Sequence, residues 1–114
     1  MRFIKSEIIR LIQRVVVPNS RILDIGCGDG EILQQLQASF AHGIDLDQRA
    51  IAKACIALPN FTFATEAIET FELPAEQVFD YILLSGVVEQ LADIHSVFQK
   101  LHKFAACDTR LVII

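Results

Sequence analysis

The stretch RILDIGCGDGEIL at residues 21–33 constrains the fold most, because an apolar strand-like run passes through glycines into a helix-like pattern. The glycines stand at alternate positions, at Gly26, Gly28 and Gly30. Glycine tolerates a positive φ and lets the backbone approach a ligand closely. A helix that follows such a loop offers free N–H groups and the positive end of its dipole. The stretch therefore predicts a strand, a ligand-binding loop and a helix in succession.

The same alternation of short apolar runs and helix-like segments continues along the chain. An amphipathic helix is predicted over 3–16. The predicted strands are 21–25, 40–44, 61–64, 79–84 and 110–114. The predicted connections are helices at 29–37, 47–57 and 91–104 and a short helical turn at 67–71. Strands separated by helices run parallel with right-handed crossovers, so we predict an α/β fold with a doubly wound, mainly parallel sheet and helices on both faces.

Length and composition narrow the class of protein. The 114 residues suggest a single domain over residues 1–114, and 53% hydrophobic against 21% charged residues predicts a buried core rather than disorder. A net charge of −4 argues against nucleic acid as a general partner, because phosphate neutralisation needs clustered Lys and Arg. No apolar run reaches the roughly 20 residues that span a bilayer. No secretory signal is visible, which favours a cytoplasmic location.

Neither cysteines nor histidines form a pattern typical of a metal site. The three cysteines are widely spaced and include no CxxC pair; they are Cys27, Cys55 and Cys107. This argues against a disulfide framework and against zinc. The three histidines have no acid or cysteine at ligand spacing; they are His42, His95 and His102. We therefore predict no metal.

The chemistry of the glycine loop favours a cationic ligand. A dinucleotide fingerprint would read GxGxxG, but this loop reads GxGxG and has Glu31 in the place of the third glycine. No GK[ST] follows, so the loop is not a Walker loop. Asp24 and Asp29 add negative charge around it, which suits a pyrophosphate badly and an ammonium group well.

Four segments together resemble class I S-adenosylmethionine-dependent methyltransferases. ILDIGCGDG resembles their motif I, and HGIDLD at 42–47 resembles the motif of their second strand. FATEAIETFELP at 63–74 and FDYILLSGVVEQLAD at 79–93 resemble the segments of strands three and four. Order and spacing both fit, from about residue 21 to residue 114. The resemblance implies a Rossmann-like sheet of order 3-2-1-4-5, S-adenosylmethionine as cofactor, and methyl transfer as activity.

The resemblance also implies a set of cofactor-binding residues. They are Asp24, Gly26, Cys27, Gly28, Gly30, Asp45, Leu46, Glu66, Ala67, Ile68, Ser85 and Gly86. Asp24 matches the acid that positions the amino-acid part of the cofactor, and the glycines let the backbone pass beneath it. Asp45 matches the acid that accepts hydrogen bonds from the ribose diol. Leu46 matches the residue that packs on the adenine.

The remaining matched positions correspond to residues that contact the two ends of the cofactor, the adenine and the methionine part. Glu66 falls where the family commonly has an acid facing the adenine amino group, with Ala67 and Ile68 beside it. Ser85 and Gly86, at the end of the fourth strand, match residues that face the methionine part and the transferred methyl.

Several of these residues allow another interpretation. Asp24 could fix the turn by accepting backbone N–H groups, and Glu66 could belong to a solvated loop. Either Asp45 or Asp47 could be a helix cap; we assign Asp45 to the ribose and Asp47 to the cap. Cys27 is interpreted as a small residue in a tight loop rather than a nucleophile.

Two departures from the family affect acceptor chemistry rather than cofactor binding. Related subfamilies carry Glu-His where this chain has Glu89-Gln90, and Gln90 cannot take a proton near neutral pH. In the family, the residue at the position of Gly86 is often Glu. No catalytic residue is assigned for this reason.

The end of the chain also differs from the family pattern. The family sheet has seven strands and ends in an antiparallel hairpin, whereas this chain has room for five strands and stops at LVII. We therefore expect a fragment of a longer protein that lacks the hairpin, and further strands or a further domain of the same polypeptide as partners.

Three functions follow in order of preference. The first is methyl transfer from S-adenosylmethionine to a small-molecule acceptor. The second is a non-catalytic methyltransferase-like module that binds the cofactor or a partner inside a larger protein. The third, a remote alternative, is an NAD-dependent oxidoreductase, against which the missing glycine at Glu31 argues.

Overall fold

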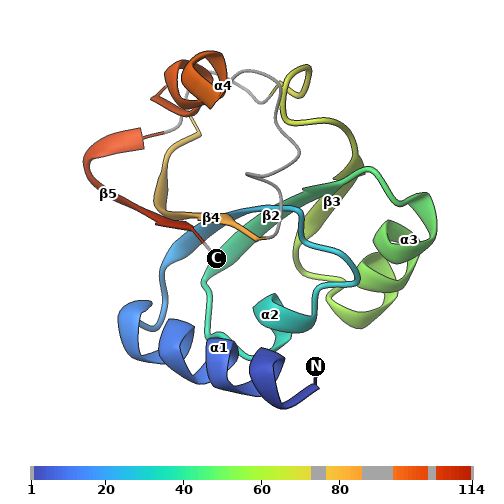
Figure 1. Ribbon diagram of the computed structural model, residues 1–114. Helices are drawn as coiled ribbons and strands as arrows, with labels where there is room; N and C mark the ends of the chain where they lie inside the picture. The colour runs from blue at the N-terminus through green and yellow to red at the C-terminus, as the bar shows by residue number, and fades with distance from the viewer. Residues whose placement is uncertain (1, 73–76, 86–93, 103–104, 114) are drawn as a thin grey trace.

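The computed structural model describes residues 2–72, 77–85, 94–102 and 105–113 (Figure 1). Helices and strands alternate along these residues. The elements are α1 (Arg2–Val15), β1 (Arg21–Ile25), α2 (Glu31–Gln34), β2 (Phe40–Asp45), α3 (Gln48–Ala57), β3 (Thr62–Thr65), β4 (Phe79–Leu84), α4 (Ile94–Leu101) and β5 (Ala105–Ile113). No helix among the described residues is long and apolar enough to cross a membrane.

The strands form one five-stranded sheet in the order β3-β2-β1-β4-β5. Each neighbouring pair of strands is parallel. β1 lies at the centre, where Asp24 is opposite Gly43 of β2 and Leu83 of β4. This order confirms the doubly wound sheet expected from the sequence. The strand order reverses at β1, so the loops after β1 and β4 diverge there, as at the ligand-binding edge of such sheets.

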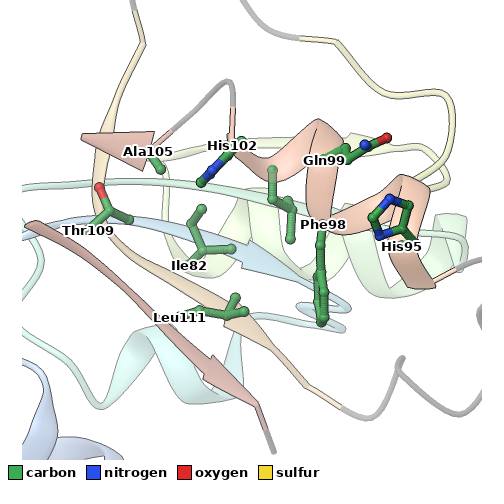
Figure 2. Close-up of a pocket in the computed structure, with 9 residues that line it drawn as sticks. Ile82, His95, Phe98, Gln99, His102, Ala105, Thr109 and Leu111 are labelled. Carbon is green, nitrogen blue, oxygen red and sulfur yellow. The ribbon is translucent and has the colours of Figure 1, made fainter. Parts of the chain in front are cut away.

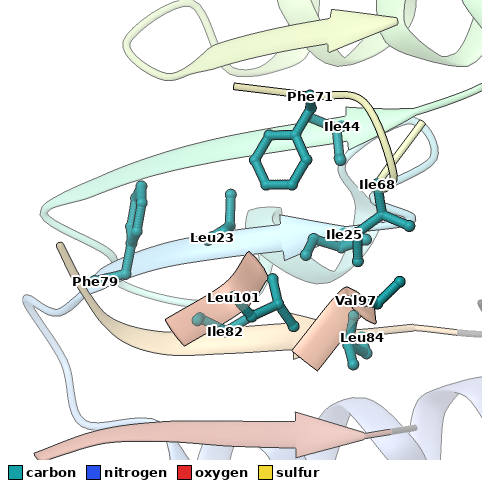
Figure 3. Close-up of a cluster of buried hydrophobic side chains, with 10 residues drawn as sticks. All are labelled: Leu23, Ile25, Ile44, Ile68, Phe71, Phe79, Ile82, Leu84, Val97 and Leu101. Carbon is teal, nitrogen blue, oxygen red and sulfur yellow. The ribbon is translucent and has the colours of Figure 1, made fainter. Parts of the chain in front are cut away.

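Helices cover both faces of the sheet, as predicted. On one face α1 and α2 contribute to a buried cluster of Ile12, Val16, Ile22, Ile32, Leu33, Ala41, Tyr81 and Leu83. On the other face α4 and the segment after β3 contribute to the cluster in Figure 3, which consists of Leu23, Ile25, Ile44, Ile68, Phe71, Phe79, Ile82, Leu84, Val97 and Leu101. The mostly apolar sequences of β1 and β4, each interrupted by one aspartate, reflect burial on both faces.

The hydroxyl of Tyr81 ties α1 to the sheet. It donates to the carbonyl of Val15 at 3.1 Å and accepts from the N–H of Val17 at 3.1 Å. Tyr81 itself is buried. The last turn of α1 is therefore held directly against β4 by a pair of bonds that satisfies a buried phenol.

Two elements differ from their predicted bounds by more than one residue at an end that the structure describes. α2 spans Glu31–Gln34 instead of 29–37, because Gly30 has a φ of 84° and the N–H of Leu36 turns back to Leu33 at 3.2 Å. β5 begins at Ala105 rather than 110, so its predicted start was wrong. Its register with β4 is irregular: Ala105 pairs with Phe79, but Arg110 pairs with Tyr81.

Two other helical predictions agree with the structure. α4 lies inside the predicted helix 91–104, of which 91–93 and 103–104 are outside the described residues. The N–H of Phe71 donates to the carbonyl of Ala67 at 2.9 Å, which confirms the short helical turn there.

Candidate functional site

Backbone hydrogen bonds tie the strand ends together at the carboxyl edge of the sheet. They join the end of β4 to β1, the glycine loop to β2, and the segment after β3 to β2. The bonds are Ser85 N–H to Ile25 O (3.1 Å), Gly26 N–H to Ile44 O (2.9 Å), Cys27 N–H to Ile44 O (3.1 Å) and Glu66 N–H to Asp45 O (3.1 Å). Four segments that are distant in sequence are thus brought to one edge.

The glycine loop has the backbone conformation that its sequence predicts. Gly26, Gly28 and Gly30 have φ values of 80°, 57° and 84°. L side chains rarely adopt such values. A Cβ atom placed on Gly28 would have no heavy atom within 4 Å, so this part of the loop borders open space. The loop therefore leaves room for a ligand above its backbone.

The carboxylate of Asp45 braces this loop from the end of β2. Its Oδ2 accepts from the N–H of Gly28 at 2.8 Å, and its Oδ1 accepts from the N–H of Asp47 at 2.8 Å. A carboxylate has roughly four acceptor positions. About half of them therefore remain for a ligand, and Asp45 is only half-buried. Its role toward a ribose stays a prediction.

Asp47 is the N-cap of α3, as we assigned it. Its Oδ1 accepts from the N–H groups of Arg49 at 3.0 Å and Ala50 at 3.3 Å. Its own φ and ψ are extended, as is typical of an N-cap residue. The two neighbouring acids thus have different tasks, because Asp45 does not cap the helix.

Asp24 is an acid buried completely beneath the loop. Neither carboxyl oxygen has a hydrogen-bond partner among the described residues. The described residues therefore give no support to the interpretation that Asp24 fixes the turn by accepting N–H groups. Burial, assisted by the nearby charge of Asp45, raises the pKa of Asp24 from 3.8 to about 7.

Cys27 is buried where the loop packs against β2, and its interpretation as a small residue in a tight loop rather than a nucleophile stays a prediction. Burial raises the pKa of its thiol, with the charges of Asp24 and Asp45 acting in the same direction, so the thiol stays protonated. A Cβ atom on Gly43 would lie 2.7 Å from the Cys27 Sγ and 2.8 Å from the ring of Phe63. Sequence reasoning missed Gly43, although a glycine inside a strand often marks such a close approach.

The other predicted residues lie around the same edge but differ in burial. Leu46 is 71% exposed beyond β2, while Glu66 and Ala67 are half-buried. Ile68 is buried in the core cluster, where Figure 3 shows it near Ile25. Their contacts with adenine stay predictions. Ser85 is half-buried at the end of β4, and Gly86 is outside the described residues.

His42 belongs to the sheet rather than to a ligand site. Its Nδ1 lies 2.6 Å from the Oγ1 of Thr62 on β3. Burial lowers the pKa of this histidine, so the ring is neutral at pH 7. Within the described part of the chain, no three His, Cys, Asp or Glu side chains gather as metal ligands would.

A pocket of about 550 Å³ lies between α4 and the sheet (Figure 2). Its lining comes from α4, the residue after it, β4 and β5, and comprises Ile82, His95, Phe98, Gln99, Leu101, His102, Ala105, Thr109 and Leu111. None of the predicted cofactor residues lines it. The ligand edge and this pocket are thus different places in the fold.

Comparison with known proteins gives a consistent picture. A family model described as a methyltransferase domain matches residues 1–114. Malonyl-[acyl-carrier protein] O-methyltransferase of Bacillus anthracis is 33% identical over 94 residues, which are 77% of this chain and 34% of that protein. The chain therefore spans about a third of the length of this curated relative.

Solved methyltransferase structures superpose well on the fold. N-methyltransferase NodS of Bradyrhizobium japonicum WM9 has a TM-score of 0.79 at 22% identity, covering 98% of this chain and 66% of NodS. NodS is also known in complex with S-adenosyl-L-homocysteine. A TehB-like SAM-dependent methyltransferase of Corynebacterium glutamicum has a TM-score of 0.76 at 29% identity, covering 92% and 59%.

These matches confirm the resemblance seen in the four sequence motifs and remove the ground for an NAD-dependent oxidoreductase. The family model covers the whole chain, including the loop of Gly28 and the carboxylate of Asp45. The chain belongs to the methyltransferase domain family, with the Rossmann-like fold of the class I S-adenosylmethionine-dependent enzymes.

Proposed function

We propose that the chain binds S-adenosylmethionine at the carboxyl edge of its sheet and transfers the methyl group to a small-molecule acceptor. One observation carries the proposal: the half-buried Asp45 carboxylate braces the glycine loop through Gly28, beside open space, and retains acceptor positions that the two backbone N–H groups do not use. A vicinal diol can donate two hydrogen bonds to one carboxylate. Asp45 is therefore suited to hold a ribose against a loop that it also orders.

The surrounding residues fit the other parts of the cofactor. The buried carboxyl of Asp24 lies beneath the loop, and together with Asp45 it favours a ligand with cationic groups. The open space at Gly28 admits the amino-acid part. The exposed side chain of Leu46 is available as an apolar surface for the adenine. These assignments use the residues that the family motifs align.

The chemistry of transfer places modest demands on the protein. When bound, S-adenosylmethionine supplies a methyl group on a reactive sulfonium. The protein's task is then to hold the acceptor nucleophile in line with that methyl and to exclude other geometries. Ser85 is held at the end of β4 by its N–H bond to the carbonyl of Ile25, and the family motif assigns it to the methionine part and the transferred methyl. Glu89 and Gln90 are outside the described residues.

The acceptor class rests on composition and on relatives. A net charge of −4 gives no electrostatic reason to expect a nucleic-acid acceptor. The Bacillus anthracis relative is named an O-methyltransferase and NodS an N-methyltransferase, so oxygen and nitrogen are both candidate acceptor atoms. The absence of a clustered cysteine pattern supports a cytoplasmic location.

The alternative is a non-catalytic module that binds the cofactor or a partner inside a larger protein. Its support is the pair of departures at Gly86 and Gln90, which replace residues that act on the acceptor in related subfamilies. Cofactor binding is required for methyl transfer and is one form of the alternative, so it is tested first.

The first test is calorimetric titration of the chain with S-adenosylhomocysteine, after circular dichroism shows that the chain is folded. We expect micromolar binding, at least tenfold weaker binding by Asp45→Asn, and unchanged binding by Asp47→Asn. Asp47 is the matched control because it is a neighbouring acid that caps α3 instead of bracing the loop. Binding of NAD in place of S-adenosylhomocysteine would refute the proposal.

A second test separates transfer from mere binding. The chain is incubated with S-adenosylmethionine and either the low-molecular-mass or the macromolecular fraction of a cell extract, and the S-adenosylhomocysteine formed is measured. Product with the small-molecule fraction supports the proposed acceptor class. Product only with the macromolecular fraction contradicts it, and binding without product in both fractions favours the non-catalytic module.

A further inference from the structure

Two acidic side chains lie close together at the glycine loop. Only one of them, Asp45, has hydrogen-bond partners among the described residues. The Asp45 carboxylate accepts hydrogen bonds from Gly28 and Asp47, both at 2.8 Å. Asp24 is fully buried, and neither of its oxygens has a partner among the described residues. A buried carboxylate without hydrogen bonds is much less stable than the neutral carboxylic acid. The arrangement therefore favours a proton on Asp24 when no ligand is bound.

The elements around Asp24 give it no positive neighbour among the described residues. Because side chains alternate along a strand, Asp24 projects to the face that Ile22 shares with α1 and α2. The titratable groups that face it are Asp45 from β2 and the Cys27 thiol from the loop. The buried residues that α1, α2 and β4 contribute to this face carry no charge: Ile12, Val16, Ile32, Leu33, Tyr81 and Leu83.

We propose that Asp24 is protonated in the cofactor-free chain and loses this proton to solvent when the cationic cofactor binds. The O–H bond of the carboxylic acid breaks, the buffer takes up the proton, and the resulting carboxylate faces the positive charge of the ligand. This inference rests on the proposed function, because it requires a cofactor that carries a sulfonium and an ammonium group. It adds that cofactor affinity is linked to pH.

The size of the effect follows from elementary electrostatics. A unit positive charge within about 6 Å of a carboxyl, at an effective dielectric constant of about 20, lowers the pKa of that carboxyl by about 2. The pKa of Asp24 in the free chain is about 7. The bound cofactor would therefore bring the Asp24 carboxyl to the ionised state at neutral pH.

The linkage predicts a direction and a magnitude. Below pH 7 binding must first remove the proton, so affinity falls as pH falls. With these values, binding at pH 8 is about tenfold tighter than at pH 6, and about 0.8 of a proton is released at pH 6 against about 0.1 at pH 8. A permanently charged Asp24 would give neither effect.

The experiment is calorimetric titration with S-adenosylmethionine at pH 6, 7 and 8, each in two buffers of different ionisation enthalpy. The difference between the buffers reports the number of protons released. We expect release by the wild-type chain and none by Asp24→Asn, which has no proton to lose. 5′-Methylthioadenosine, which lacks both cationic groups, should bind with no proton release.

A second measurement avoids dependence on the variant. Infrared difference spectra of the wild-type chain at pH 6 should lose the carbonyl band of a protonated carboxylic acid when S-adenosylmethionine binds. Binding without proton release, or equal release by Asp24→Asn, would overturn this inference and leave the proposed function intact. A folded chain that binds no S-adenosylmethionine at any pH would overturn both.

Discussion

Replacing Asp24 with asparagine should change how the stability of the cofactor-free chain depends on pH. Burial raises the pKa of Asp24 from 3.8 to about 7 in the folded chain. Between these two values the unfolded chain has lost the proton while the folded chain keeps it. The unfolded state thus binds fewer protons, so the free energy of unfolding falls as pH rises through this window and levels off above pH 7.

The magnitude follows from the width of the window. Each pH unit inside it costs about 1.4 kcal/mol. The slope falls to half as pH reaches the folded pKa near 7, so the two units from pH 5 to pH 7 lower the free energy of unfolding by about 2 kcal/mol in the wild-type chain. Such a loss is a large part of the roughly 5–15 kcal/mol that stabilises an ordinary domain. An asparagine side chain does not ionise, so the Asp24→Asn variant should be spared this loss.

The assay is urea unfolding followed by circular dichroism at pH 5, 6, 7 and 8. The free energies of wild-type and Asp24→Asn chains should diverge with pH, and the variant should be the more stable one at pH 8. Asp29→Asn is the matched control, because Asp29 is an exposed acid on the same loop. If wild-type and Asp24→Asn curves stay parallel from pH 5 to pH 8, Asp24 is not the titrating group.

Three further changes test the packing that positions the site. Gly43→Ala should lower the free energy of unfolding by about 1–3 kcal/mol in urea titrations, because the new Cβ would lie 2.7 Å from the Cys27 Sγ. An unchanged free energy of unfolding would mean that the loop shifts to accommodate the methyl group. Asp47→Ala should cost about 1 kcal/mol by the same assay, through loss of the α3 cap. Tyr81→Phe should cost about 1–3 kcal/mol, because it leaves the partly buried N–H of Val17 without its acceptor; hydrogen exchange should speed up there and not in β2.

Sequence patterns predicted the central strands well and the peripheral elements less well. β1 and β4 have the predicted bounds, because burial on both faces makes each of them mostly apolar, with a single aspartate inside the run. β5 starts five residues early, since residues 105–109 adopt an irregular pairing that depends on β4 rather than on their own pattern. The length of α2 was overestimated because the apolar periodicity continues past Gln34, where the bonds of Gln35 and Leu36 already reach back three residues instead of four.

For the site, the sequence alone identified candidate residues but not the contacts between them. The glycine loop, Asp24 and Asp45 follow from motif positions, and parallel strands place their carboxyl ends at one edge. The close approach of Gly43 to Cys27 depends on the register of β1 against β2, which no single-strand pattern contains. The lack of partners at Asp24 among the described residues is likewise a property of the folded surroundings.

The position of Asp45 explains why loop order and ligand binding belong together in this fold. Its backbone carbonyl holds Glu66, and its carboxylate holds Gly28 and the start of α3. One residue thus fixes three segments of the ligand edge, while its remaining acceptor positions are left for a ligand. Truncation to alanine would remove both hydrogen bonds and a ligand contact at once, whereas asparagine keeps one acceptor oxygen and loses the charge together with one of the two bonds to Gly28 and Asp47. Burial and, to a smaller extent, the charge of Asp45 raise the pKa of the unpaired Asp24 carboxyl, so a cation bound at this edge would favour the ionised form of both acids.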